Sequence, residues 1–361
     1  MRSGKLIVLV VLALGVAACG SSNKSDTNAG GGGGGGGGGT VNGAGSTFAA
    51  PIYSQWGNAL KDQGLTVNYQ PVGSGAGVAQ FAAGTVDFGA SDPALAPEDK
   101  ATIKKGEPVQ IPMAFGAITV SYNLEGVDKG LKLDGATVAD IFLGKVKTWN
   151  DPAIAKLNSG VTLPSDPITV VHRSDESGTT KGFTSFLSAY SPEWEKQVGS
   201  DKTVKWPTGT GAKGNDGVAA GVKQQKGSVG YVEEAYALQN NFTTAAVKNK
   251  SGAFVEPTLE STTAAGDGVK IPDDLGIDII NSPNPKAYPI ASQTFVIVYK
   301  DSCKAGRSEA TAKALKQFVD YGLGDGQTVL QQLQYAQLPD AVLSKARDAA
   351  SGLTCNGQPI A

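Results

Sequence analysis

The sequence predicts an α/β protein whose folded body begins near residue 41 and holds about two domains. Its 361 residues are 40% hydrophobic and 18% charged, a composition typical of globular proteins. Short β-branched segments alternate with segments of helical periodicity along the body, which is the pattern of layered α/β folds. The 49 glycines fit many short elements joined by turns, and some of them are concentrated in one run.

The first part of the body shows a strand, a turn and a helix start more than once. Leu65–Val72 alternates apolar and polar residues like a strand. The glycine- and serine-rich turn after it leads into an apolar helical segment. In order, we expect a glycine-rich turn from Val41, a helix over Ile52–Leu60, a strand over Leu65–Val72, a turn over 73–77 followed by a helix, a short strand over Thr85–Asp92, and one or two strands over Val109–Tyr122.

The middle of the body continues this alternation. Val170–Leu187 passes from a β-branched segment through a polar turn into a helical pattern. The other elements expected there are two helices within Leu131–Leu157, a polar helix over Ser191–Val204, a short strand over 204–206, a glycine-rich turn over 209–217, and a helix and strand after it. Residues 239–285 are rich in Asn, Thr and Pro and are expected to be irregular.

The C-terminal part begins with the strongest strand in the chain. Ile290–Lys300 is dense in β-branched residues. Helices are expected after it over Glu309–Tyr321, Thr328–Leu333 and Asp340–Ala350. Cys303 and Cys355 are expected to form a disulfide if the protein is exported into an oxidising environment. The alternative is two free thiols.

The N-terminus is typical of an export signal. Arg2 and Lys5 precede a short apolar run, Leu6–Val16, and small residues lead to Cys19. The run is too short to span a bilayer as a stable helix. The segment resembles a lipoprotein signal, which implies cleavage of residues 1–18 and lipid attachment at Cys19. The alternative is an ordinary secretory signal cut near Ala18.

Residues 19–40 are expected to be a flexible tether. The segment is small and polar and contains an unbroken glycine run from Gly30 to Gly39, which has no side chains to bury. About twenty residues of such coil reach roughly 25 Å. Signal and tether together predict an exported protein that is lipid-anchored to the cell envelope, at the outer face of the cytoplasmic membrane or in the periplasm.

The overall charge argues against two classes of partner. The formal net charge is −2 at pH 7. Nucleic-acid-binding domains carry a basic footprint and membrane-surface proteins carry polybasic patches, and this sequence has neither. We therefore expect no nucleic-acid partner, and contact with a membrane through the N-terminal lipid alone. Any anion site must be made by local donors.

Val170–Leu187 contains such donors. Arg173 carries a rigid fork of N–H groups. Ser177, Gly178 and Thr179 stand where a helix would begin, and free backbone N–H groups and the helix dipole favour an anion there. The alternative is an Arg173–Asp175 pair on a solvated loop ahead of an ordinary capped helix. This stretch alone does not decide between them.

The sequence offers little for catalysis. His172 is the single histidine, and it lies in a predicted strand with no nucleophile motif nearby. A histidine-based metal site lacks ligands, and no metal or cofactor is expected. Oxyanion donors recur instead at turn–helix junctions, at Thr47-Phe48, Ser74 and the stretch after Arg173. We therefore expect a binding protein rather than an enzyme.

Seven segments resemble the phosphate-binding proteins of bacterial phosphate ABC importers. The resemblance extends from Val41 to about Ala350, in order and with few gaps. The segments are specific as a set: GAGSTFAAPIY, GSGAGVAQ, TVDFGASDPAL, ADIFLGKVKTWNDPAIAKLN, HRSDESGTT, KGNDGVAAGV and YAQLPDAV. The sequence departs from a common family pattern at Asp175-Glu176-Ser177-Gly178, where the family often has Asp-Gly-Ser-Gly. Glu176 alters none of the matched donors.

The resemblance implies a two-lobed, periplasmic-binding-protein-like fold of type II, with a ligand cleft between the lobes and two hinge crossovers. Lobe one would comprise 41–116 plus 291–361, and lobe two 117–290. The implied function is capture of inorganic phosphate and its delivery to the ABC permease subunits, by a monomer without a cofactor. The residues that match the family's phosphate site are Thr47, Phe48, Ser74, Asp92, Arg173, Ser177, Gly178 and Thr179, with Asp175 orienting Arg173.

Asp92 makes phosphate the expected ligand. An ionised carboxylate only accepts hydrogen bonds. Hydrogen phosphate still carries a proton for Asp92, whereas sulfate would place a second negative charge against it. The alternatives are a binder of another tetrahedral oxyanion such as sulfate, a secreted phosphatase, and a surface protein with an adhesion or sensing role.

Overall fold

The computed structural model describes residues 39–127 and 130–360, and its body is an α/β structure, as the sequence predicts. The lipoprotein signal over 1–18, Cys19 and nearly all of the tether lie outside the described residues. No helix in the described part of the chain is long and apolar enough to cross a membrane.

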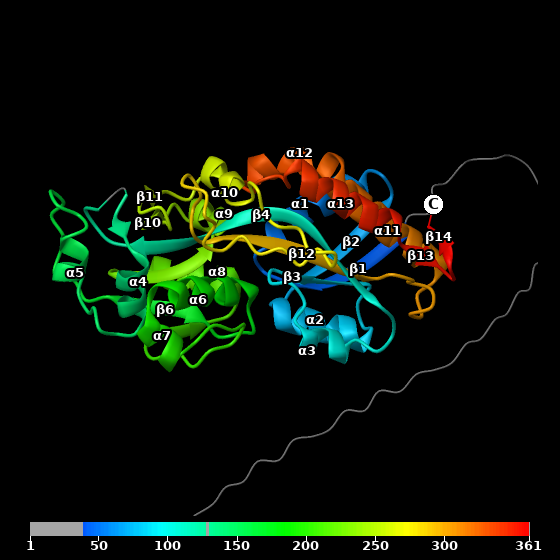
Figure 1. Ribbon diagram of the computed structural model, residues 1–361. Coiled ribbons are helices and arrows are strands. Elements are labelled where there is room, and N and C mark those ends of the chain that lie inside the picture. The colour runs from blue at the N-terminus through cyan, green and yellow to red at the C-terminus, as the bar shows by residue number, and fades with distance from the viewer. Residues whose placement is uncertain (1–38, 128–129, 361) are drawn as a thin grey trace, which may run out of the picture. The chain divides into compact units, whose positions relative to one another are not determined.

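A nine-stranded sheet forms the frame of the body (Figure 1). Its strands run in the order β2-β1-β3-β12-β4-β8-β6-β7, and β9 pairs with β4 outside this path. The sheet contains β1 (Gly39–Gly45), β2 (Leu65–Pro71), β3 (Phe88–Ser91), β4 (Pro108–Asn123), β6 (Thr169–Arg173), β7 (Thr210–Ala212), β8 (Ser228–Glu233), β9 (Thr243–Thr244) and β12 (Ala291–Tyr299). Two small sheets contain β5 (Lys132–Leu133), β10 (Ala246–Lys248), β11 (Phe254–Val255), β13 (Thr354–Cys355) and β14 (Gln358–Pro359).

The strand β4 belongs to both halves of this sheet. Its residues from Pro108 to Ala117 pair antiparallel with β12, and those from Ile118 to Asn123 pair antiparallel with β8. On the β12 side the neighbouring strands β1, β2 and β3 are mutually parallel, and on the β8 side β6, β7 and β8 are parallel. One strand of 16 residues therefore runs through both halves of the sheet.

Helices cover both faces of each half. Figure 1 shows α1, α11 and α13 on one side of the β1–β3–β12 half and α2 and α3 on the other. In the second half, α8 packs on one face of β6 and β8, and α6 packs on the opposite side with α4. The helices are α1 (Ala50–Lys61), α2 (Ser74–Ala83), α3 (Pro97–Thr102), α4 (Gly135–Phe142), α5 (Pro152–Ala155), α6 (Gly178–Tyr190), α7 (Pro192–Gln197), α8 (Gly214–Gln224), α9 (Glu234–Gln239), α10 (Leu259–Ala265), α11 (Glu309–Leu323), α12 (Asp325–Leu330), the 3₁₀ turn η1 (Gln331–Leu333) and α13 (Asp340–Ser351).

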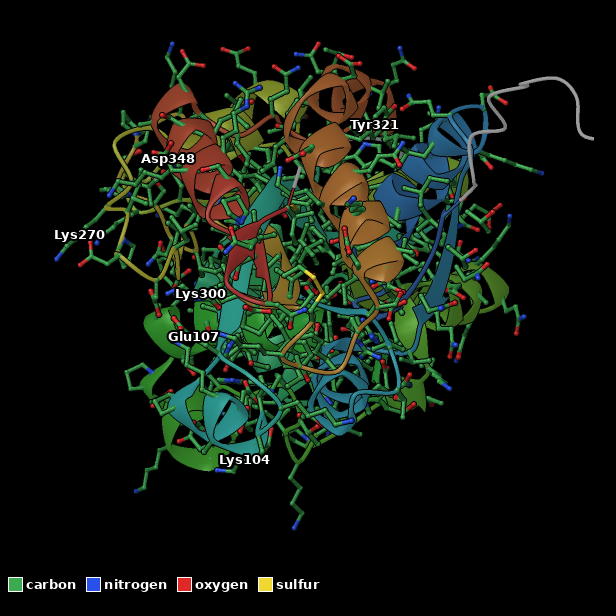
Figure 2. All side chains as sticks on the ribbon, turned by 90° about the vertical axis from the view of Figure 1, so that its right-hand side faces the viewer. Lys104, Glu107, Lys270, Lys300, Tyr321 and Asp348 are labelled. Atoms are coloured by element: carbon green, nitrogen blue, oxygen red, sulfur yellow. A yellow bond between two sulfur atoms is a disulfide. The ribbon has the colours of Figure 1, made fainter. Side chains whose placement is uncertain are left out.

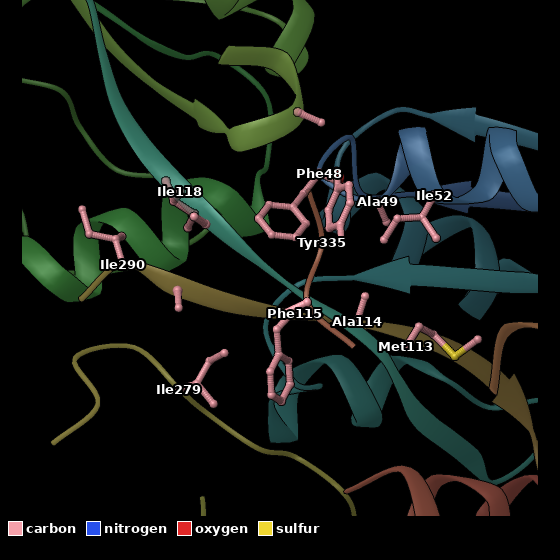
Figure 3. Close-up of a cluster of buried hydrophobic side chains, with 14 of the residues drawn as sticks. Phe48, Ala49, Ile52, Met113, Ala114, Phe115, Ile118, Ile279, Ile290 and Tyr335 are labelled. Carbon is pink, nitrogen blue, oxygen red and sulfur yellow. The ribbon is translucent and has the colours of Figure 1, made fainter. Parts of the chain in front are cut away.

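The core is continuous where the two halves meet (Figure 3). The rings of Phe48 and Tyr335 lie edge to face beside β4, with centroids 5.8 Å apart. Phe115 and Ile118, on β4 itself, are fully buried around them. Burying a side chain of this size stabilises the fold by about 1.5–3 kcal/mol. The aromatic cluster therefore anchors the shared strand against the chain that follows β1.

The glycine-rich turn expected from Val41 is wrong: this segment is the strand β1. A Cβ built at Gly43 would lie 2.0 Å from the Phe88 ring, and one built at Gly45 would lie 2.1 Å from the Ala90 carbonyl oxygen. The glycines are there because β3 and its side chains approach closely, not because the chain turns.

Two expectations between residues 191 and 206 are also wrong in part. The helix expected over Ser191–Val204 is only α7, which ends at Gln197. Residues 204–206 form no strand. The Trp206 ring instead stacks on the ring of His172, with centroids 4.6 Å apart, and Pro207 follows with no N–H for a sheet ladder.

Residues 239–285 are less irregular than expected. They contain β9, β10, β11 and α10. Thr258 and Ser261 form a reciprocal capping box at the start of α10. The strand pairs here are only two or three residues long, so their hydrophobic periodicity is too short to be recognised in the sequence.

Cys303 and Cys355 are joined by a disulfide, visible as the yellow bond in Figure 2. The bond closes a loop with a sequence separation of 52 residues. Replacing both cysteines with serine is expected to lower the free energy of unfolding by about 2–4 kcal/mol, because the unfolded chain gains freedom. Differential scanning calorimetry of the variant and the parent, both without reductant, measures this loss. An unchanged unfolding temperature would contradict it.

Candidate functional site

The segment from β6 into α6 has the strand–turn–helix form expected from the sequence. Ser177 caps α6, and its hydroxyl oxygen accepts a hydrogen bond from the Thr180 N–H at 3.0 Å. The Gly178 N–H donates to Ser74 Oγ, at the start of α2, at 3.2 Å. The N-termini of two helices from different halves of the sheet therefore meet at this point.

Arg173 ends β6 and is 2% exposed. Its Nε donates to Asp175 Oδ1 at 2.7 Å and its Nη2 to Asp175 Oδ2 at 2.5 Å, which is a bidentate pair. Its Nη1 donates to Thr179 Oγ1 at 3.3 Å. Asp175 and Thr179 therefore contact all three nitrogens of the guanidinium.

The Asp175 carboxylate is held by more than one donor. Besides Arg173, the Gly214 N–H donates to its Oδ1 at 3.0 Å. Burial works to raise the pKa of Asp175, but the hydrogen bonds and positive charge of Arg173 outweigh it, so the pKa lies below its ordinary value. Asp175 therefore stays ionised and keeps Arg173 in one orientation.

Asp92 follows β3 and is 1% exposed. Its Oδ1 accepts hydrogen bonds from Ser46 Oγ at 2.5 Å and Thr294 Oγ1 at 3.0 Å. Burial raises the pKa of Asp92 to about 6, and the hydrogen bonds from Ser46 and Thr294 limit the rise. The carboxyl group is therefore poised to change its protonation state not far below neutral pH.

Thr47 contributes its side-chain hydroxyl to the site, whereas the side chain of Phe48 packs in the core. Thr47 Oγ1 accepts hydrogen bonds from the Asn215 backbone N–H at 3.2 Å and the Asn215 Nδ2 at 2.8 Å. The ring of Phe48 is in the core, and its carbonyl oxygen accepts from the Tyr335 hydroxyl at 2.6 Å. Phe48 can therefore offer a ligand its backbone N–H but not its side chain.

All eight residues expected to bind the anion belong to one buried cluster. Ser74 lies between Asp92 and Gly178: its Oγ is 3.5 Å from Asp92 Oδ2 and accepts from the Gly178 N–H. On the other side, Asn215 connects Thr47 to Thr179, with Nδ2 at 3.4 Å from Thr179 Oγ1. Hydroxyls, backbone N–H groups, the Arg173 guanidinium and the Asp92 carboxylate therefore converge from the segments that follow β1 and β3, the start of α2, the end of β6 and the start of α6.

Four residues of this cluster were not identified from the sequence: Ser46, Asn215, Tyr231 and Thr294. The Tyr231 hydroxyl accepts from the Arg173 backbone N–H at 3.1 Å and contacts Thr180 Oγ1 at 2.6 Å. Asn215 lies in KGNDGVAAGV, one of the segments that carry the family resemblance, so that motif was the available signal. Ser46 likewise lies in GAGSTFAAPIY, beside Thr47, whereas Thr294 lies in none of the segments that carry the resemblance.

Glu176, where the sequence departs from the common family pattern, lies at the edge of the cluster. Its carbonyl oxygen accepts from the Gly75 N–H at 3.1 Å. Its carboxylate lies 3.3 Å from Lys202 Nζ, which also lies 2.8 Å from Asp99 Oδ1 on α3. Glu176 therefore helps to hold the β6–α6 turn against α2 and α3.

His172 lies outside the cluster. Its ring stacks on Trp206, and burial lowers its pKa below the ordinary value. Its Nδ1 lies 3.0 Å from the Arg173 carbonyl oxygen. Within the described residues no group of three or more His, Cys, Asp or Glu side chains is arranged to hold a metal ion. The chemistry that these side chains support is recognition of an anion by hydrogen bonds.

Comparison with known proteins identifies the family of the chain. Residues 30–325 match the family model described as a PBP superfamily domain. The phosphate-binding protein PstS of Pasteurella multocida is 44% identical over 310 residues, which cover 85% of this chain and 88% of that protein. The phosphate-binding protein PstS 3 of Mycobacterium leprae is 35% identical over 375 residues, which cover 97% and 98% of the two chains.

Solved structures show the same fold. A human phosphate-binding apolipoprotein superposes with a TM-score of 0.71 at 20% identity, covering 88% of this chain and 99% of that one. A putative phosphate ABC transporter substrate-binding protein from Clostridium perfringens, solved with bound phosphate, gives 0.61 at 18% identity, covering 83% and 100%. The expected periplasmic-binding-protein-like fold is therefore confirmed. By its sequence and its fold, the chain belongs to the PstS family of phosphate-binding proteins within the PBP superfamily.

Proposed function

We propose that this protein binds inorganic phosphate and delivers it to the permease subunits of an ABC importer. The observation that carries the proposal is the buried Asp92 carboxylate facing the N-terminus of α6 beside the guanidinium of Arg173. The names of the relatives, which are phosphate-binding proteins, support the same ligand.

The charge pattern distinguishes phosphate from other tetrahedral anions. Arg173 and the backbone N–H groups of α6 attract any oxyanion. Asp92 repels one that is fully deprotonated, and accepts a hydrogen bond from one that keeps a proton. A site built around one such hydrogen bond rejects an analogue without it by roughly 10⁴–10⁵. Hydrogen phosphate is the anion that meets both requirements.

The donors proposed for the phosphate are the hydroxyls of Thr47, Ser74, Ser177 and Thr179, the N–H groups of Phe48 and Gly178, and the guanidinium of Arg173. The Gly178 N–H donates to Ser74 Oγ in the structure and would exchange this bond for one to the ligand. Asp92 accepts the proton of the ligand, and Asp175 orients Arg173. This set performs binding and leaves the ligand unchanged, so we propose no catalytic role. The protein acts as a monomer and uses no cofactor.

Release to the permease would require the two halves to separate. We propose lobes of 41–116 plus 291–361 and of 117–290 that close on the ligand by a hinge. The division is supported by β4, which exchanges β12 for β8 between Ala117 and Ile118, and by β12, whose pairing begins at Ala291. The hydrogen bond from Asn215 to Thr47 crosses the proposed boundary, and contacts of this kind would stabilise a closed arrangement.

Isothermal titration calorimetry of the purified protein with phosphate and with sulfate, at matched ionic strength, tests the function. Phosphate is expected to bind at least about a thousandfold more tightly than sulfate, in line with the discrimination that such a site achieves. Equal affinity for the two anions would favour a general oxyanion binder. Turnover of a phosphate ester that is lost on His172→Ala substitution would favour a phosphatase instead.

We further propose that residues 1–18 are removed and that Cys19 carries a lipid anchor in the cell envelope. Replacing Cys19 with serine is expected to release the protein from the membrane fraction, because the lipid is the proposed attachment and no helix within residues 39–127 and 130–360 could cross a membrane instead. Fractionation of cells expressing the two forms, followed by immunoblotting, measures this. A Cys19→Ser protein that stays as firmly membrane-bound as the parent would contradict the anchor.

A further inference from the structure

The two carboxylate oxygens of Asp92 have unequal surroundings. Oδ1 accepts two hydrogen bonds from hydroxyls, at 2.5 Å from Ser46 and 3.0 Å from Thr294. Oδ2 lies 3.5 Å from the Ser74 hydroxyl, a distance at which little hydrogen-bond energy remains. A Cβ built on Gly178 would lie 2.5 Å from Oδ2, so this oxygen faces the N-terminus of α6. Oδ1 therefore accepts two hydrogen bonds within the fold, whereas Oδ2 faces the N-terminus of α6.

The two hydroxyls on Oδ1 are fixed by the fold. Ser46 is 1% exposed; its N–H donates to the Ala90 carbonyl at 3.0 Å and its carbonyl accepts from the Tyr69 hydroxyl at 2.7 Å. Thr294 is fully buried on β12, next to the register shift between Thr294 and Phe295. Because neither hydroxyl has access to bulk water, each gains more from the Asp92 carboxylate than an exposed one would.

We propose that Ser46 and Thr294 are specificity-determining residues that act through Asp92. This inference rests on the proposed phosphate-binding function. By donating to Oδ1, the two hydroxyls favour the ionised carboxylate and keep Oδ2 as an acceptor for the proton of hydrogen phosphate. Sulfate, which carries no proton near neutral pH, meets a full negative charge at the same place. Ser46 and Thr294 are positioning residues and need not touch the ligand.

Among the ionisable groups around Asp92, Arg173 also favours the ionised carboxylate, and neither Ser46→Ala nor Thr294→Val removes it. Arg173 contributes the positive charge that acts on Asp92, and it is paired with Asp175. Four tyrosines face Asp92 from other elements, and burial raises the pKa of each, which keeps them neutral: Tyr53 on α1, Tyr69 on β2, Tyr236 on α9 and Tyr335 after η1. Arg173 and the Ser74 hydroxyl also favour ionised Asp92, but both are proposed donors to the ligand. The hydroxyls of Ser46 and Thr294 can therefore be removed without removing a proposed ligand donor.

Sulfate is the informative probe, because it stays deprotonated from mildly acidic to neutral pH and reports the protonation of Asp92 alone. We expect sulfate affinity, measured by calorimetry, to rise as the pH falls through the range in which Asp92 becomes protonated. In Ser46→Ala this rise should begin about one pH unit higher, because a hydrogen bond that favours the charged form is lost. At neutral pH the preference for phosphate over sulfate should fall about tenfold.

Thr294→Val removes the second hydroxyl and should shift the sulfate profile in the same direction. Thr294→Ser restores the hydroxyl and should bring the profile back toward that of the parent. The second site also keeps the test decisive if Ser46→Ala does not fold. A merely structural role would weaken phosphate and sulfate equally at every pH, without moving the profile.

Two results would overturn the inference. The first is an unchanged sulfate profile in both Ser46→Ala and Thr294→Val. The second is an equal loss of phosphate and sulfate affinity in both variants. Either result, with a parent protein that prefers phosphate, leaves the proposed function intact. A parent protein that binds phosphate no better than sulfate contradicts the proposed function itself.

Discussion

Replacing Arg173 with methionine is expected to weaken phosphate binding by about 30-fold to several thousand-fold, which corresponds to about 2–5 kcal/mol. Methionine fills a similar volume but offers no donor to the anion. Arg173 is 2% exposed, so water cannot take its place. The change also leaves the Asp175 carboxylate, half-buried beside the site, without its bidentate partner. Calorimetric titration of the variant with phosphate measures the loss.

Two further variants separate the causes of this loss. Arg173→Lys keeps a positive charge but cannot form the planar fork, so it should recover only part of the affinity. Asp175→Asn combined with Arg173→Met removes the stranded negative charge and should bind phosphate better than Arg173→Met alone. If Arg173→Met kept an affinity within about twofold of the parent, the guanidinium would not belong to the phosphate site.

The fold was predictable wherever the local pattern and the tertiary structure agree. Leu65–Pro71 alternates because β2 pairs on one side with β1 and packs on α1, and Ala291–Tyr299 is β-branched because every residue of β12 is buried. β1 was not predictable in this way. Its glycines are required because the Phe88 ring and the Ala90 backbone lie very close to them. These neighbours belong to a segment about 45 residues away in the sequence, which is the separation of the hydrogen-bonded pair Asn42 and Asp87.

The residues of the candidate site fall into the same two groups: those whose local sequence indicates their role, and those whose role depends on contacts with distant parts of the chain. Arg173 and the Ser177-Gly178-Thr179 turn were recognisable because donor chemistry and a helix start occur together within a few residues. Ser46 and Thr294 were not, because each is an ordinary small polar residue until Asp92 is placed beside it. The Thr294–Asp92 hydrogen bond spans 202 positions of the sequence. Two residues so far apart in the sequence form no periodicity or motif spacing from which their contact could be predicted.

Replacing Asp92 with asparagine is expected to collapse the discrimination between phosphate and sulfate. The parent site should reject sulfate by roughly 10⁴–10⁵, because a deprotonated anion meets a buried negative charge. An asparagine amide is neutral and can donate to sulfate, while it accepts the phosphate proton more weakly than a carboxylate does. We expect phosphate affinity to fall and sulfate affinity to rise, measured by calorimetry at neutral pH. A variant as selective as the parent would remove Asp92 from the proposed mechanism.

The same variant should be more stable than the parent when no phosphate is bound. Burial raises the pKa of Asp92 from its ordinary value of 3.8 to about 6, so the folded state binds more protons than the unfolded state between these values. The parent therefore loses stability as the pH rises through this range, by up to about 3 kcal/mol from Asp92 at neutral pH.

Asparagine carries no charge and avoids this cost, so the difference in unfolding free energy between variant and parent should grow from about pH 4 to neutral pH. Glu233 and Glu234, whose pKa values burial also raises, affect both proteins alike and cancel in the difference. Chemical denaturation over this pH range measures it. If this difference in unfolding free energy does not change with pH, ionised Asp92 does not destabilise the folded parent protein. If the difference grows as the pH rises, ionised Asp92 lowers the stability of the ligand-free protein. The fold is then less stable than it could be because it retains an acceptor for the proton of its ligand.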